Sequence, residues 1–211
     1  MLGELVVKYT THRACAGRFK ISLLHAFLSQ SYCRWRSVPG APAGTGTVFS
    51  YAVPEEDNEI QFYGDSSTRT FKLLVNDERV DVDIPQVLDG QWHNVIITWD
   101  GRKGDWEVFV DGIGRARGRG LAPGHTVRPD GTWILGQEQD IVGGGFEPFQ
   151  AYVGDLAEFH IWDKVLSQEE RNYVLAGRLT GNFVDWRSIT VGTQGRVYSA
   201  PFQPGEPDNQ C

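Results

Sequence analysis

Short segments rich in β-branched and aromatic residues recur along the chain from about Tyr32, and turn residues separate them. Segments of this kind, bounded by Gly, Pro, Asn or Asp, are typical of β-strands. The pairs Asn76-Asp77 and Asp111-Gly112 predict tight hairpin turns. Together these features predict an antiparallel β-sandwich. The predicted strands are Val48–Val53, Glu59–Tyr63, Thr70–Val75, Asn94–Trp99, Trp106–Val110, Trp133–Leu135 and Leu156–Trp162.

One segment has the pattern of a helix instead. Ser167, followed three residues later by Glu170, forms a capping box, in which each side chain can bond the backbone amide of the other residue. The predicted helix continues through Leu175, and Gly177 can end it in left-handed geometry. The sequence therefore predicts an all-β fold with one short helix.

The composition limits the range of functions. A chain of 211 residues suits one domain with a sizeable core, and 25 glycines with many aromatic residues suit a sheet protein with many turns. The net charge of −7 argues against a nucleic-acid partner and suits a cation-binding surface. No segment is long and apolar enough to predict insertion into a membrane.

Three carboxylates gather in one glycine-rich stretch, where Glu138, Asp140 and Glu147 follow the predicted strand that ends at Leu135. Glu138 and Asp140 are two residues apart, so in extended backbone they point the same way and repel each other. No Lys, Arg or His occurs between residues 138 and 150. A solvated acidic turn would explain an isolated loop of this kind. Calcium explains it too, because calcium takes several carboxylate, amide and carbonyl oxygens in flexible geometry.

A second acidic segment favours calcium. Phe49-Ser50-Tyr51-Ala52 precedes Glu55-Glu56-Asp57-Asn58-Glu59, and together with Leu135-Gly136-Gln137-Glu138-Gln139-Asp140 it resembles the pentraxins, a calcium-dependent family. The runs Phe159–Asp163 and Gly181-Asn182 match the family pattern as well. The similarity runs from about Tyr32 to about Val197 and is nearest to the neuronal pentraxins.

The resemblance implies a paired calcium site. One ion would be held by Asp57, Asn58, Glu138, Asp140 and the backbone carbonyl of Gln139. Glu138 and Asp140 would bridge to a second ion that Glu147 and Gln150 complete, and this ion should bind more weakly because it has fewer ligands. Four carboxylates nearly balance two dications. The ions would then keep coordination positions for an anionic ligand, such as a phosphorylated headgroup, a glycan or a partner protein.

The resemblance also implies architecture and location. It predicts a two-sheet jelly-roll sandwich of the legume-lectin and pentraxin type, with the helix on the side away from the calcium ions. It predicts a homo-oligomer, pentameric by analogy, and a secreted or extracellular location, with a larger membrane-tethered protein as one option. The expected organisation is an unassigned segment at 1–30, a pentraxin-like domain at 31–200 and a Pro-rich tail at 201–211.

The cysteines depart from the family pattern. The three cysteines, Cys15, Cys33 and Cys211, cannot all pair within one chain. The family joins the position of Cys33 to a cysteine whose place is taken here by Ile96. The sequence therefore predicts that this disulfide is absent, with Cys33 as a small buried apolar residue.

Two further features predict ligand contacts. Tyr63 lies near the place where phosphocholine-binding pentraxins carry an aromatic wall, and it also suits an ordinary strand end. Arg115, Arg117 and Arg119 would form a basic stripe for polyanions if the strand is extended, whereas a solvated edge is the simpler interpretation.

Catalysis is not predicted. Glu138-Gln139-Asp140 begins like the E-x-D-x-x-E pattern of jelly-roll glucanases, but residue 143 is Gly and completes no such set. The leading hypothesis is a non-enzymatic recognition module. An adhesion or receptor-tethering domain with structural calcium and a carbohydrate-active hydrolase are the alternatives.

Overall fold

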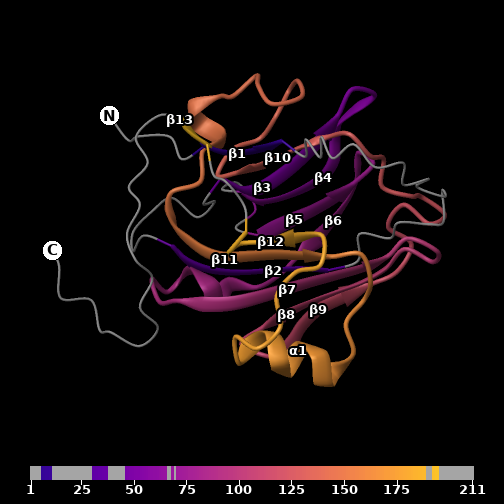
Figure 1. The fold of residues 1–211 in the computed structure, drawn as a ribbon, viewed down its shortest axis with the longest axis vertical. Coiled ribbons are helices and arrows are strands. Elements are labelled where there is room, and N and C mark those ends of the chain that lie inside the picture. The colour runs from indigo at the N-terminus through magenta and orange to yellow at the C-terminus, as the bar shows by residue number, and fades with distance from the viewer. Residues whose placement is uncertain are drawn as a thin grey trace, which may run out of the picture.

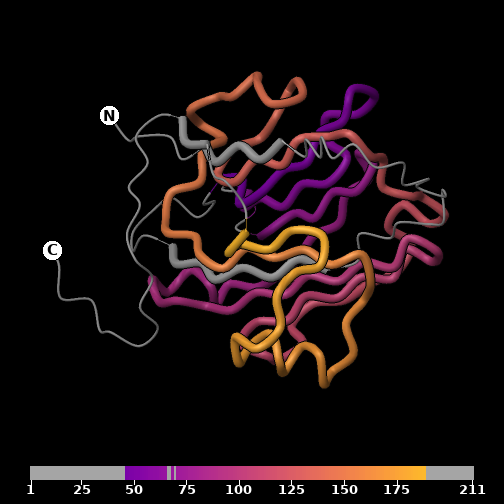
Figure 2. Tube along the Cα trace, in the orientation of Figure 1, coloured from indigo at the N-terminus to yellow at the C-terminus, as the bar shows by residue number. Residues whose placement is uncertain are grey.

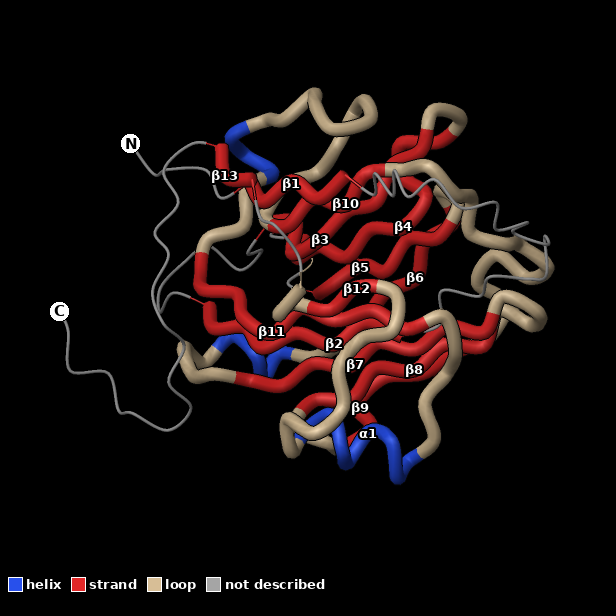
Figure 3. The backbone as a smooth tube through the Cα atoms, viewed as in Figure 1, coloured by secondary structure: helices blue, strands red, loops and turns tan. Residues whose placement is uncertain are grey.

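The computed structural model of the chain describes residues 6–10, 30–37, 46–65, 68, 70–188 and 192–194, with side-chain surroundings for 46–65, 68 and 70–188. These residues form a jelly-roll sandwich of two antiparallel sheets with one α-helix (Figures 1 and 3). The order is β13-β1-β10-β3-β4-β5-β6 in the seven-stranded sheet and β12-β11-β2-β7-β8-β9 in the six-stranded sheet. The elements are β1 (Val6–Thr10), β2 (Gln30–Ser37), β3 (Gly46–Val53), β4 (Glu56–Asp65), β5 (Thr70–Val75), β6 (Glu78–Val82), η1 (Pro85–Leu88), β7 (His93–Asp100), β8 (Asp105–Val110), β9 (Ile113–Gly118), β10 (Thr132–Leu135), η2 (Pro148–Gln150), β11 (Gly154–Trp162), α1 (Gln168–Leu175), β12 (Val184–Asp185) and β13 (Gly192–Gln194).

The predicted strands and turns are confirmed. Each predicted strand lies within an observed strand, and β5 has the predicted bounds. Asn76 and Asp77 have φ values of 50° and 59°, and Asp111 and Gly112 have 52° and 81°. Positive φ at both central residues is the geometry of a type I′ hairpin, whose twist matches the flanking strands. Local turn chemistry therefore fixes two of the hairpins.

The segment without a predicted element contributes a strand. Val6–Thr10 forms β1, which pairs antiparallel with β10 so that Val7 lies opposite Leu135. In the other sheet, β2 pairs with β7, and its register places Cys33 opposite Val95 and Tyr32 opposite Ile96. Cys15, Cys211 and the tail at 201–211 lie outside the described residues.

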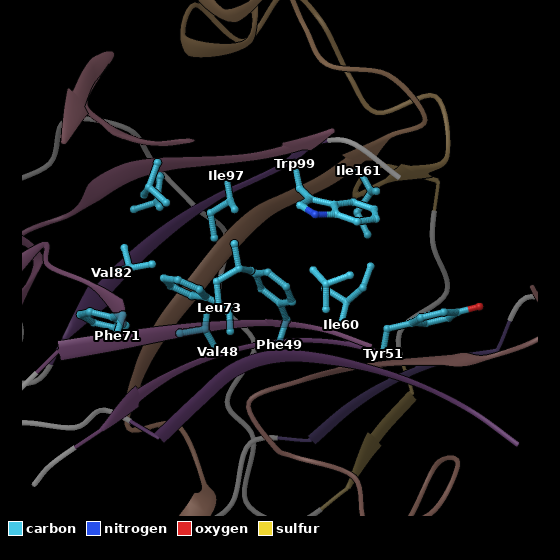
Figure 4. Close-up of a cluster of buried hydrophobic side chains, with 14 of the residues drawn as sticks. Val48, Phe49, Tyr51, Ile60, Phe71, Leu73, Val82, Ile97, Trp99 and Ile161 are labelled. Carbon is cyan, nitrogen blue, oxygen red and sulfur yellow. The ribbon is translucent and has the colours of Figure 1, made fainter. Parts of the chain in front are cut away.

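The main core fills the space between the sheets. Phe49, Tyr51 and Phe71 extend from the seven-stranded sheet toward Ile97 and Trp99 of the six-stranded sheet (Figure 4). All of these side chains are buried. Removal of this apolar surface from water is the dominant favourable term in folding. The aromatic residues noted in the sequence thus hold the two sheets together.

A second, smaller core lies beneath α1, on the face of the six-stranded sheet that points away from the other sheet (Figure 1). Ile96 is fully buried there, with Phe109, Trp162 and Val174 as neighbours. An apolar side chain thus fills the position where the family pattern has a half-cystine. At the start of the helix, Ser167 Oγ accepts from the amide of Glu170 at 3.2 Å, which confirms the capping box.

Candidate functional site

Two segments far apart in sequence follow from neighbouring strands in the middle of the seven-stranded sheet. β10 pairs with β3, with Leu135 opposite Phe49, and β3 pairs with β4. The loop that follows β10 (residues 136–153, the site loop) and the β3–β4 hairpin project on the same side of the molecule (Figure 2). The sheet order therefore brings the two acidic segments of the sequence together.

Glu138 lies at the centre of this group. Burial raises the pKa of its carboxyl, and the negative charges of Asp140, Asp57 and Glu147 raise it further, against a hydrogen bond from the Gln150 side chain. Only 8% of Glu138 is exposed, and its Oε2 atom has no hydrogen-bond partner. A buried carboxylate oxygen without a partner is costly unless a cation or a donor binds it. Glu138 thus has the environment of a ligand rather than of a surface acid.

Gln150 has a second oxygen of this kind. Its Oε1 atom is buried and has no hydrogen-bond partner. The residue ends the short turn η2, which lies within the site loop (Figure 3). Two oxygens without partners, one carboxylate and one amide, match the donor types that calcium prefers.

The two glutamines of the loop hold its backbone. Gln137 and Gln139 are fully buried. The Gln139 side chain donates to Thr132 O at 3.0 Å and to Ser50 Oγ at 3.1 Å, and its Oε1 accepts from the amide of Gly143 at 2.8 Å. Because this side chain is fully engaged, only the backbone carbonyl of Gln139 can serve as a ligand. Gln137 Nε2 donates to Glu147 O at 2.9 Å and so ties the two halves of the loop together.

The hairpin side of the group is fixed in a similar way. Asp57 and Asn58 are half-buried near the start of β4. The Asn58 amide donates to Glu56 Oε1 at 3.0 Å, and Asn58 O accepts from the amide of Asp77 at 3.2 Å. The next side chain, Glu59, is fully buried. The backbone of Asn58 is therefore held on both its amide and its carbonyl side.

Glycine geometry lets the loop turn back on itself. Gly145 has a φ of 74°, and a Cβ atom placed there would lie 2.7 Å from the Cβ of Asp140. Only glycine avoids this clash, and glycine adopts positive φ at no steric cost. The close approach brings Gly145 and Asp140 together, two residues before Glu147.

The arrangement suits a hard cation. Asp57, Asp140 and Glu147 all act electrostatically on Glu138, yet no three His, Cys, Asp or Glu side chains within the described ranges are already grouped as tightly as a metal requires. Carboxylates that repel one another spread apart until a cation draws them in. The donor set consists of oxygens alone, which favours calcium or magnesium over zinc.

The other predicted contacts lie on β4 and at β9. Tyr63 is half-buried on β4, opposite Thr47 and Lys72 in the ladders. Arg115 and Arg117 are exposed on β9, at the edge of the six-stranded sheet, so the extended conformation is present. Arg119 is exposed as well, with its Nε 3.8 Å from Asp105 Oδ1. A role of these four residues in ligand binding stays a prediction.

Sequence reasoning did not single out Gln137 and Glu59 as supports of the site. Both residues alternate along the chain with the expected ligands, and this alternation could have indicated their supporting role. Gln137 and Gln139 flank Glu138, and Glu59 follows Asn58 directly. In extended backbone, neighbouring side chains face opposite ways, so ligands on one side imply supports on the other.

Comparison with known proteins gives a consistent result. The family model described as "Pentaxin family" matches residues 32–201. Mouse neuronal pentraxin-2 is 40% identical over 194 residues, which cover 90% of this chain and 44% of that protein. Rat neuronal pentraxin-1 is 43% identical over 176 residues, covering 81% of this chain and 40% of the relative. The chain thus spans less than half the length of these relatives.

No helix in the described part of the chain is long and apolar enough to cross a membrane.

A solved structure agrees on the fold. The native heptameric SAP-like pentraxin of Limulus polyphemus superposes with a TM-score of 0.65, covering 90% of this chain and 92% of that one at 23% identity. At this identity the likeness shows the jelly-roll architecture alone. The family match covers most of the chain, and the neuronal relatives share about two residues in five with it. The chain belongs to the pentaxin (pentraxin) family.

Proposed function

We propose that this chain is a non-enzymatic, calcium-dependent recognition module. Two calcium ions would be held by oxygens of Asp57, Asn58, Glu138, Gln139, Asp140, Glu147 and Gln150. The observation that carries the proposal is the state of Glu138, a buried carboxylate with an oxygen that lacks a partner and with three acidic neighbours. Calcium bound there would supply the missing positive charge and offer open coordination positions to an anionic ligand.

The ions would act as a bridge to the ligand. The loop between residues 138 and 150 contains no basic side chain, so the protein alone repels an anion there. A dication reverses the local sign of charge, as bound ions do when they are the largest charges in a site. Phosphorylated headgroups, glycans and acidic groups of a partner protein all present oxygens that calcium accepts.

The similar proteins support an extracellular location and assembly into a homo-oligomer. Neuronal pentraxin-2 and the neuronal pentraxin receptor of the rat, which is 36% identical over 181 residues, are the kinds of protein in which such a domain occurs. We propose a secreted or membrane-tethered parent protein and a ring-shaped homo-oligomer, pentameric by analogy, which would turn weak single sites into avidity. Because the Limulus relative is a heptamer, light scattering is the measurement that fixes the ring size.

Thermal unfolding tests the calcium site. At about one hundred times its dissociation constant, a ligand of the folded state adds about 2.7 kcal/mol, which raises the Tm by several degrees. We expect millimolar calcium to raise the Tm and the same concentration of magnesium to have little effect. An unchanged Tm in calcium would refute the proposal.

A second candidate function uses the same ions differently. In an adhesion or receptor-tethering domain, calcium would brace the site loop while another surface binds protein. The hydrogen bonds of Gln137 and Gln139 across this loop favour a bracing role. A large calcium-dependent rise in Tm without any binding of phosphocholine or phosphoethanolamine would select this candidate.

A further inference from the structure

The site loop exposes apolar side chains as well as carboxylates. Seven large hydrophobic residues are strongly exposed in the described part of the chain, and three of them lie in this loop. Ile141 is 65% exposed, Val142 39% and Phe149 80%. Phe149 is the most exposed of the seven. Exposed apolar residues scattered singly need no explanation, whereas their gathering at a binding edge calls for a partner.

These residues are interleaved with the expected calcium ligands. Ile141 and Val142 directly follow Asp140, and Phe149 lies between Glu147 and Gln150. The exposed apolar side chains and most of the expected calcium ligands therefore share one short loop. We call Ile141, Val142 and Phe149 the apolar rim.

The backbone beneath the rim is well anchored. Around Phe149, the Gln150 amide donates to Glu147 O at 3.0 Å, and Ala151 forms a bridge with Thr47 of β3. Gly46 leaves room for this contact, because a Cβ atom there would lie 2.1 Å from Ala151 O. Phe149 is thus held in an exposed position by a turn fixed to the sheet.

The second half of the rim is anchored too. The Gly144 amide donates to Ile141 O at 2.9 Å. A Cβ atom at Gly144 would lie 3.2 Å from Cγ1 of Ile141, so the Ile141 side chain lies over the backbone of this glycine. It nevertheless keeps most of its surface exposed. Both halves of the rim therefore present apolar surface from ordered backbone.

Charge decides what kind of surface the rim can meet. Apolar and acidic groups alone would be repelled by an anionic surface. With two dications against the three carboxylates of the loop and that of Asp57, the site becomes nearly neutral, and its ions can bind phosphate oxygens. A phospholipid bilayer offers phosphates with apolar chains directly beneath them, so one partner satisfies both halves of the surface.

We propose that the apolar rim inserts into the boundary between headgroups and acyl chains of a phospholipid bilayer while the adjacent calcium ions bind lipid phosphates. This inference rests on the calcium site of the proposed function. It commits to a bilayer surface, because a soluble headgroup would leave Phe149 and Ile141 in water. The contact is peripheral and involves side chains alone.

Vesicle co-sedimentation tests the proposal. The 211-residue chain is mixed with vesicles of phosphatidylcholine and phosphatidylserine, in calcium or in EGTA. We expect sedimentation in calcium only, and we expect Phe149→Ser to weaken it about tenfold or more, the loss that follows from keeping one large apolar side chain out of the lipid. Ile141→Ser should have a smaller effect in the same direction. Phe183→Ser is the matched control, since Phe183 is 44% exposed outside the site loop.

The readouts separate the two proposals. Phe149→Ser should keep the calcium-dependent rise in Tm and the affinity for soluble phosphocholine. If calcium raises the Tm of the natural chain but vesicles do not bind, or if they bind Phe149→Ser and the natural chain equally, the membrane inference is wrong and the proposed function stands. If calcium does not raise the Tm, both are wrong. If Phe149→Ser dissolves an oligomer and neither protein binds vesicles, the rim is a contact between copies and the inference is overturned.

Discussion

The carboxylate of Glu59 and residue Arg128 are joined twice, although 69 positions separate them in the sequence. Glu59 Oε1 accepts from the Arg128 backbone amide at 2.6 Å, and Oε2 forms an ion pair with the guanidinium of the same residue. His125 Nε2 lies 2.9 Å from Oε1 as well. The connection from β9 to β10 is thereby fastened to the strand that carries Asp57 and Asn58.

Glu59→Gln should therefore destabilise the protein by about 2–3 kcal/mol, since it removes charge-assisted bonds to a fully buried carboxylate. It should also weaken calcium binding, because Asn58 loses its support on the next residue. Denaturant unfolding measures the loss of stability, and a calcium titration followed by fluorescence measures the loss of calcium affinity. The control is Glu55→Gln, which changes an exposed carboxylate at the hairpin tip and should leave both quantities nearly unchanged. Equal behaviour of the two variants would contradict this role of Glu59.

The two glutamates of the site loop should differ in their effect on the ions. Glu138→Gln should damage both calcium sites, because Glu138 is proposed to bridge the two ions. Glu147→Gln should weaken mainly the second ion. Calorimetric calcium titration resolves the two steps, and the expected pattern is loss of both steps in the first variant and of one step in the second. Equal loss in both variants would refute the assignment of Glu138 as the bridging ligand.

His93 should make the stability depend on pH. Burial alone would lower its pKa, but hydrogen bonds to the carboxylates of Asp111 and Asp89, at 2.8 and 2.9 Å, outweigh burial and raise the pKa. A raised folded-state pKa gives a contribution that is complete below the unfolded value, about 6.5, and is lost as the pH rises through the folded value. His93→Gln should therefore cost more stability at pH 6 than at pH 9 in urea unfolding.

His160 serves as a control, because its contribution to stability should depend on pH in the opposite direction to that of His93. Burial lowers its pKa, and its Nδ1 accepts from the amides of Gly181 and Trp186 at 3.3 Å each, which requires that nitrogen to be unprotonated. The contribution of His160 is present above the unfolded pKa and is lost as the pH falls through the lower folded value. Substitution of His160 should therefore cost less stability at acid pH than at neutral pH. The same pH trend for both histidines would contradict these environments.

Ile96 should be critical to the core beneath α1. Ile96→Ala removes a fully buried side chain that contacts the cluster of Phe109, Trp162 and Val174, and should cost about 2–5 kcal/mol. Ile113→Ala is the matched control, since Ile113 is 54% exposed, and its cost should stay within about 0.5 kcal/mol. Thermal unfolding of both variants makes the comparison. A small cost for Ile96→Ala would mean that the helix adds little to the stability of the sheet.

Local sequence patterns were enough to predict the elements that have a strong local signal. The other elements depend on long-range contacts. Alternation and hairpin residues were enough for β5 and for the turns at Asn76 and Asp111, and the capping box was enough for α1. β1 carries no comparable signal, because it is defined by its pairing with β10, more than a hundred residues away.

The same division applies to the candidate site. The acidic residues and the glycines were visible in the sequence, and the resemblance gave them roles. The buried oxygen of Gln150 without a partner and the exposure of Phe149 were not predictable, because both depend on how the site loop folds against β3. The bond from Glu59 to Arg128 needs the assembled sandwich as well.

The position of β9 has a consequence for aggregation. Among the described residues β9 is the last strand of the six-stranded sheet, so no described strand pairs with its outer backbone groups. Arg115 and Arg117 are exposed along it, and two copies approaching edge to edge would bring like charges together. Natural sheets protect open edges in this way. The charge of these arginines therefore works against the joining of separate molecules through this strand.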